Sequence, residues 1–293
     1  MNVYLKEDAK SYSENVEFQE EIIQLHVHAF PSLKDVFSRP WDFRYTLEAR
    51  TVSDPSMAFQ RFKTETVRYL KSKSGRKKML AQAEQVVAMR KKWAAESLDA
   101  GNLYSAGMAG MAALTDAGIM NAYFVHGLLS SSGFVEAFKK TGGLFAEIKE
   151  VLPVSNRLNQ LAVDEIMGKV SRYLGFLRSN TDNPDSFPLD SVQEALLRRK
   201  VERLKRFGDE WNLFFLMYGE IFWFWLSGSR EETFEEHIQT LPGPICDDME
   251  LFGFVKMTPS EVDQLCSLAD EWVALTKQNE LGEMNRTSGS YNG

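Results

Sequence analysis

Residues 79–129 read MLAQAEQVVAMRKKWAAESLDAGNLYSAGMAGMAALTDAGIMNAYFVHGLL, and this stretch decides the fold class. In its first part, apolar side chains recur at intervals of three and four residues with charged side chains between them, which predicts an amphipathic helix over residues 75–98. Asp99-Ala100-Gly101-Asn102 interrupts this pattern, and a second helix is expected over residues 103–129. The second segment is rich in Ala, Gly and Met, and small residues of this kind let a neighbouring helix approach closely.

The helical period continues towards the C-terminus. Further helices are expected over residues 134–141, 144–152, 157–178, 191–207 and 209–226, and a short one ends near Thr240. Thr258-Pro259-Ser260-Glu261 has the pattern of a capping box, which predicts a last helix from there to about Gln278. The tail, residues 280–293, has little apolar content and is expected to be disordered.

The first seventy residues differ from the rest. β-Branched and aromatic residues predict short strands over residues 3–5 and 45–52, and residues 17–30 are expected to be helical. The predicted fold class is therefore mainly α, an antiparallel helical bundle preceded by a small α+β N-terminal piece. The expected domains are residues 1–70 (α+β), 71–178 (bundle), 179–279 (further helices packed on the bundle) and 280–293 (tail).

Composition and charge exclude several classes of protein. The 293 residues include 34 Lys and Arg against 41 Asp and Glu, a net charge of −7, which disfavours binding to bulk nucleic acid. Two cysteines, Cys246 and Cys266, are too few for a disulfide framework, and the N-terminus lacks the pattern of a secretory signal, so a cytoplasmic location is expected. The most apolar stretch, residues 211–226, is shorter than the roughly 20 residues that cross a bilayer, so no membrane partner is expected.

No metal site is expected from the histidines. They are His26, His28, His126 and His237. None of their spacings places two ligands on one face of a helix, and His26 and His28 would point in different directions there. Asp247-Asp248 could hold magnesium-bound diphosphate, but adjacent acids after two prolines are more typical of a solvated loop.

Two basic clusters, residues 71–78 and 198–206, could present a groove to nucleotide phosphates. In the first cluster, Arg76, Lys77 and Lys78 are the candidate phosphate ligands. The alternative is a solvated helical face, partly neutralised by pairs such as Glu194 with Arg198, four residues apart.

Two acids interrupt apolar helices, Asp116 within residues 108–124 and Glu220 within residues 211–226. A buried carboxylate without a partner is costly and its pKa rises, so each is either paired or serves as a general base. Asp116 and Glu220 are therefore the candidate catalytic residues. Asn121, Tyr123 and His126 follow Asp116 on the same helix and are the candidate substrate-binding residues.

Residues 47–56, LEARTVSDPS, are followed by a helix expected over residues 59–70, and AGNLYSA, residues 100–106, leads into the Ala-rich helix. This order resembles small-molecule nucleotidyltransferases of the kanamycin and lincosamide types, in which a HEPN-like (higher eukaryotes and prokaryotes nucleotide-binding) helical bundle follows the catalytic domain. The resemblance implies Mg²⁺ and ATP as cofactors, and Asp116 as the carboxylate that activates the acceptor hydroxyl. The family's Gly-Ser turn and Asp-x-Asp pair belong upstream of the matched residues and are not found here, so the resemblance leaves catalysis without its metal ligands.

The leading functional hypothesis is thus a nucleotidyltransferase-like protein whose helical domain binds a small-molecule or nucleotide ligand, with a homodimer left open. A non-catalytic protein-interaction module is the first alternative, supported by the aromatic run Phe222-Trp223-Phe224-Trp225. A HEPN-type ribonuclease is the second, because Arg230 and His237 have the Arg-x6-His spacing of that active site. Gly228-Ser229 before Arg230 matches the family's Gly-Ser turn in letters only, because no acids on a strand follow it.

Overall fold

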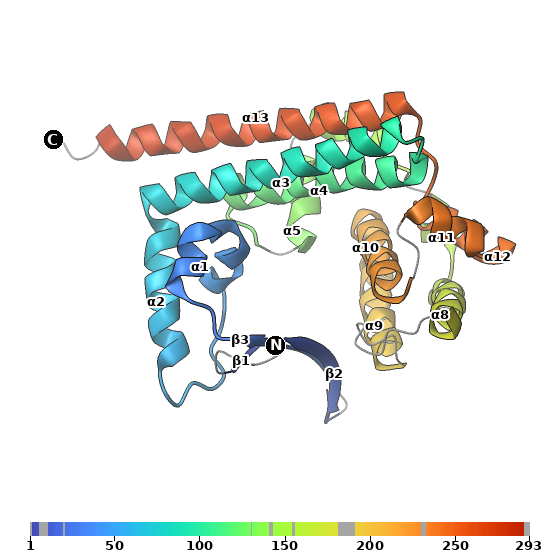
Figure 1. Cartoon of the computed structure of the whole chain (residues 1–293), viewed down its shortest axis with the longest axis horizontal. Coiled ribbons are helices and arrows are strands. Elements are labelled where there is room, and N and C mark those ends of the chain that lie inside the picture. The colour runs from blue at the N-terminus through green and yellow to red at the C-terminus, as the bar shows by residue number, and fades with distance from the viewer. Residues whose placement is uncertain are drawn as a thin grey trace. The chain divides into compact units, whose positions relative to one another are not determined.

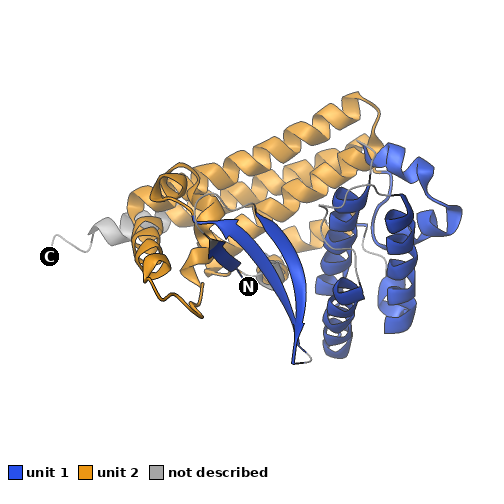
Figure 2. Ribbon diagram, turned by 60° about the horizontal axis from the view of Figure 1, so that its bottom comes forward, with its two compact units in different colours: residues 1–30, 152–256 blue, residues 31–151, 257–293 orange. Residues whose placement is uncertain are grey.

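Figure 1 shows the computed structural model of the chain, which describes residues 2–5, 11–19, 21–129, 131–140, 143–153, 156–180, 191–229 and 233–289. The chain divides into two compact units, distinguished by colour in Figure 2. Unit 1 comprises Met1–Phe30 and Leu152–Lys256, and unit 2 comprises Pro31–Val151 and Met257–Gly293. Because each unit joins segments that are far apart in sequence, this division differs from the domains predicted with boundaries at residues 70, 178 and 279.

Unit 1 contains a small sheet and a group of helices. In the sheet the strand order is β1-β3-β2, with β1 parallel and β2 antiparallel to the central strand. The strands are β1 (Asn2–Leu5), β2 (Tyr12–Phe18) and β3 (Glu21–Ala29). The helices are α7 (Asn156–Gln160), α8 (Val163–Asn180), α9 (Ser191–Phe207), α10 (Glu210–Gly228), α11 (Phe234–Thr240) and α12 (Gly243–Leu251).

Unit 2 is helical. Its elements are α1 (Leu33–Ser38), the 3-10 helix η1 (Pro40–Leu47), α2 (Ala58–Lys71), α3 (Lys73–Asp99), α4 (Leu103–His126), α5 (Ser131–Lys140), α6 (Gly143–Val151) and α13 (Pro259–Gly289). The long helices α3, α4 and α13 lie side by side (Figure 1). The mainly α fold with a small N-terminal sheet is therefore confirmed.

Glycines on one face of α4 bring α13 close. A Cβ atom added at Gly107 would meet the side chain of Met257, and one added at Gly118 would meet the indole ring of Trp272. Farther along, the Asn121 amide donates to Thr276 Oγ1 at 3.0 Å. The residue numbers of these partners rise together, so α4 and α13 run parallel, and the small residues of α4 pack against a neighbour as predicted.

Ion pairs set the register between α3 and α13. Arg76 pairs with Glu280, Glu84 with Lys277 at 2.8 Å, and Lys91 with Asp270, so α13 runs antiparallel to α3. Glu280 is only 1% exposed. The last of these contacts lies at Glu280, past the predicted helix end near Gln278, and α13 continues to Gly289. Residues 290–293 lie outside the described residues.

Two predictions for the N-terminal region are wrong. Residues 17–30, expected to be helical, form the end of β2 and the whole of β3, because the β-branched residues Ile22, Ile23 and Val27 lie in a strand paired on both sides. Residues 45–52, expected to be a strand, continue η1 to Leu47 and are irregular beyond it. Pro40 begins η1 and its buried neighbour Trp41 stacks on Phe124, with ring centroids 5.8 Å apart.

Candidate functional site

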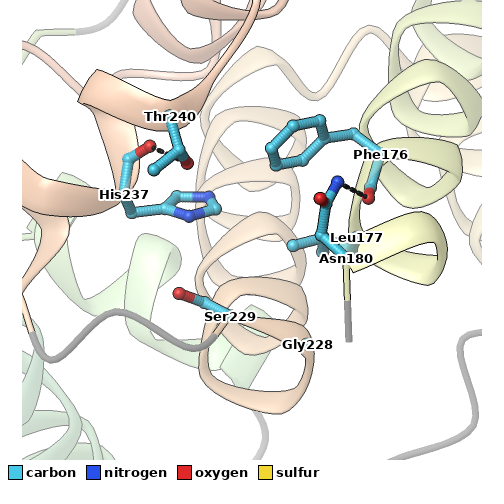
Figure 3. A pocket seen from close by; sticks show the side chains of 7 residues that line it. All are labelled: Phe176, Leu177, Asn180, Gly228, Ser229, His237 and Thr240. Carbon is cyan, nitrogen blue, oxygen red and sulfur yellow. Dashed lines mark hydrogen bonds between the residues drawn. The ribbon is translucent and has the colours of Figure 1, made fainter. Parts of the chain in front are cut away.

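The candidate functional site is a cavity of about 190 Å³ inside unit 1. Three elements build it, as Figure 3 shows: the end of α8, the end of α10 with the residue after it, and α11. Its lining residues are Phe176, Leu177, Asn180, Gly228, Ser229, His237 and Thr240. It is smaller than the roughly 300 Å³ at which pockets for drug-sized ligands begin, so its size suits a fragment or one ring system.

His237 is the central polar residue of this cavity. Its side chain is fully buried, and its Nε2 atom is hydrogen-bonded to the Tyr173 hydroxyl at 2.8 Å. The rings of Phe176 and Phe234 lie 6.3 and 5.7 Å from the imidazole, measured between centroids. The Tyr173 hydrogen bond fixes the orientation of the imidazole within the wall of the cavity.

Local sequence signals position the other lining groups. Thr233 caps α11 and forms a capping box with Glu236, which fixes the start of the helix that carries His237. The Thr240 hydroxyl donates to the His237 carbonyl at 2.8 Å in the last turn. The Asn180 amide donates to the Phe176 carbonyl at 2.8 Å at the end of α8. One apolar wall, two hydroxyls, one amide and one imidazole thus meet at the cavity.

Glu220, a candidate catalytic residue, is held in a structural network of unit 1. Its carboxylate accepts hydrogen bonds from Lys200 Nζ at 2.7 Å and Gln193 Nε2 at 3.2 Å. The buried Gln193 in turn accepts one from the Asn15 amide of β2. The network connects α9, α10 and β2, so Glu220 has the partners that the structural alternative requires.

Asp116, the other candidate catalytic residue, lies in unit 2 and pairs with Arg90 of α3, Oδ2 to Nε at 3.1 Å. Burial raises the pKa of its carboxyl, although the charges of Arg90 and Arg44 oppose this shift. The side chain keeps 28% of its exposure, so its removal from water is partial. Asp116 therefore has an arginine partner and a raised pKa together.

The three candidate substrate-binding residues point to different neighbours. Asn121 is buried against Thr276 of α13, and its Oδ1 atom has no hydrogen-bond partner among the described residues. Tyr123 packs edge-on against Trp41 of η1, with centroids 5.5 Å apart, and burial raises the pKa of its hydroxyl. His126 is half-buried at the end of α4, where burial and then the charge of Lys140 lower its pKa. The structure does not bring these side chains together around Asp116.

The three candidate phosphate-binding residues have different environments. Arg76 is engaged in the ion pair with the buried Glu280 through both Nε and Nη2. Lys77 and Lys78 are exposed, and Lys78 Nζ lies 3.5 Å from the Phe37 carbonyl. The two lysines therefore lie on a solvated helical face, which was the alternative to a phosphate site, whereas Arg76 is part of an ion pair.

Two further predictions are corrected. Asp248 is not in a solvated loop: it lies in α12, is 2% exposed, and accepts from Lys169 Nζ at 2.6 Å and from Arg172 Nε at 3.0 Å. His26 and His28 are not on a helix but on β3, where alternate residues share a face. Within the described residues no group of three or more His, Cys, Asp or Glu side chains could hold a metal ion.

Two observations bear on the alternative functions, the protein-interaction module and the ribonuclease. Trp223 and Leu226 of α10 are exposed by 61% and 50%, and an apolar surface of this kind is what an interaction module requires. Arg230, the partner of His237 in the ribonuclease motif, lies outside the described residues. In the part of the chain that the structure describes, no helix is long and apolar enough to span a membrane.

His237, Gly228 and Ser229 stand out in the sequence, but no sequence pattern connects them to the end of α8. One sequence signal could have indicated this site. An apolar helix ends at Gly228, and a short capped helix that carries His237 follows soon after it. No protein-family model matches the chain, and no curated protein and no solved structure is significantly similar to it.

Proposed function

We propose that the chain is a small-molecule-binding protein and that its ligand site is the cavity at His237. The observation that carries this proposal is a fully buried imidazole, oriented by Tyr173, in the lining of a cavity of about 190 Å³. Tyr173 satisfies His237 Nε2, so the imidazole is a fixed part of the cavity wall. Hydrogen bonds between a ligand and the other polar lining groups would be strengthened by the low dielectric of a partly enclosed site.

The lining favours a planar polar ring as the ligand. Phe176 and Leu177 supply an apolar surface, on which a ring can pack, and Asn180, Ser229 and Thr240 supply hydrogen-bonding groups for its edge. A nucleobase has this combination of flat faces and polar edges. Under this proposal the base enters the cavity while the sugar and phosphates remain outside.

Calorimetric titration of the full chain with adenosine, guanosine, cytidine and uridine, and with ATP and Mg²⁺, tests the proposal. We expect saturable binding of at least one of them with a Kd below about 100 μM, or about −5.5 kcal/mol. The absence of heat with all five would overturn the proposal.

A pair of variants locates the site. Ser229→Leu introduces a larger apolar side chain at a residue that lines the cavity, whereas Ser227→Leu makes the same change at a residue that does not line it. We expect Ser229→Leu to weaken binding at least tenfold and Ser227→Leu to retain the wild-type Kd. Equal affinities for Ser229→Leu and the wild type would place the ligand elsewhere and contradict the proposed site.

A further inference from the structure

Two histidines lie side by side on the central strand of the unit 1 sheet. His26 and His28 are separated by one residue on β3, so both side chains leave the same face of the sheet. Their rings are nearly parallel, with an interplanar angle of 18° and centroids 6.4 Å apart. Val27 between them points to the opposite face and is buried, whereas both histidines keep part of their surface exposed.

Neighbouring strands constrain the two imidazoles. Ser13 of β2 lies opposite His26, and its Oγ atom is hydrogen-bonded to His26 Nδ1 at 2.9 Å. Tyr4 of β1 lies opposite His28, with ring centroids 6.0 Å apart. Because Ser13 engages Nδ1, the Nε2 atom of His26 is the nitrogen left to bind a ligand. Among the described residues, none forms a hydrogen bond with the His28 imidazole.

We propose that His26 and His28 form a chelating site for a divalent transition-metal ion that prefers imidazole, such as Ni²⁺, Cu²⁺ or Zn²⁺. Imidazole nitrogen suits these ions, and each would lie about 2.0–2.1 Å from two ring nitrogens, as in zinc sites. Side-chain rotation that tilts the two rings towards each other provides this geometry without moving the strand. Water would complete the coordination shell, because the site supplies only two protein ligands.

The Ser13 hydroxyl is a positioning group in this site. A hydrogen bond to the second nitrogen of a ligating histidine fixes its tautomer and ring orientation, and its loss typically weakens metal binding by about 10- to 100-fold. The proposal therefore includes a residue that does not touch the metal but affects its affinity. It does not depend on the ligand of the His237 cavity.

The test is calorimetric titration of the tag-free, chelator-treated full chain with NiCl₂. We expect one ion per chain in the wild type, a loss of affinity of at least tenfold in His26→Gln and in His28→Gln, and about a tenfold loss in Ser13→Ala. His126→Gln removes a half-buried histidine elsewhere and should leave the affinity unchanged. Circular dichroism of each variant checks that the fold is retained.

Three results would overturn the proposal: no uptake of Ni²⁺ by the wild type, wild-type affinity in His26→Gln and His28→Gln, or binding that survives when both histidines are replaced. The last result would assign the ion to other side chains, such as Cys246 or Cys266.

As a second measurement, the electron paramagnetic resonance spectrum of the Cu²⁺ complex should show two nitrogen ligands in the wild type and one in each single variant. A spectrum identical in all three proteins would contradict the site even if a variant were less stable.

Discussion

At the scale of single residues, Asp116 experiences two opposing effects. Burial raises the pKa of its carboxyl, Arg90 at 3.1 Å lowers it, and burial prevails. When the pKa of a group is higher in the folded than in the unfolded protein, its protonated form stabilises the fold. This contribution is complete at pH values below the pKa of the unfolded protein, and it is lost as the pH rises through the pKa of the folded protein. Asp116→Asn removes this dependence. We therefore expect the wild-type Tm minus the variant Tm to be larger near pH 4 than near pH 7; the opposite order would show that Arg90 controls the carboxyl.

The candidate phosphate ligands provide a second test at this scale. Arg76 neutralises Glu280, which is 1% exposed, whereas Lys77 beside it is exposed. Removing one partner of a buried ion pair leaves an uncompensated charge, so Arg76→Ala should lower the free energy of unfolding by about 3 kcal/mol. Lys77→Ala should change it by less than about 0.5 kcal/mol. Urea denaturation of both variants checks this difference, and equal effects would mean that Arg76 has no structural role.

At the scale of helices, the contact between α4 and α13 depends on side-chain volume. A Cβ atom at Gly118 would collide with Trp272, which is fully buried and stacked on Phe138 with centroids 4.1 Å apart. Gly118→Ala should therefore lower the Tm, despite the higher helix propensity of Ala, because overpacking costs about 1–3 kcal/mol. Gly168→Ala, at an exposed position inside α8 with open space around it, should raise the Tm by the propensity gain. Two shifts of the same sign would contradict this account.

Helices with a strong period or a capping signal could be predicted from the sequence, and the N-terminal segment could not. The expected helix over residues 191–207 coincides with α9, and the Thr258 capping box forms, with Glu261 N donating to Thr258 Oγ1 at 3.3 Å. Residues 17–30 mix charged and β-branched residues in a pattern compatible with either structure, and pairing with two other strands decides between them. The same decision governs the proposed metal site, since His26 and His28 share a face only on a strand.

At the scale of the whole molecule, the sequence did not indicate which helices belong together. Unit 2 needs α13, some 150 residues after the α4 positions that it contacts, and unit 1 needs the first thirty residues together with the segment from Leu152 to Lys256. Periodicity describes the face that each helix buries but not the partner that covers it. The cavity at His237 follows the same rule, because its lining comes from three helices whose proximity is a property of the assembled unit.

The division into units predicts the effect of removing α13. A chain ending at Lys256 keeps every residue of unit 1 but deprives unit 2 of Trp272, Thr276 and Glu280, which contact α3 and α4. The apolar face of α4 would then be open to water, so we expect increased binding of the dye ANS and a loss of helical circular dichroism greater than the removed residues explain. A chain ending at Gly289 is the matched control and should behave as the full chain does. Unchanged helicity per residue and no dye binding in the shorter chain would show that α3 and α4 fold without α13, and would contradict the assignment of that helix to the core of unit 2.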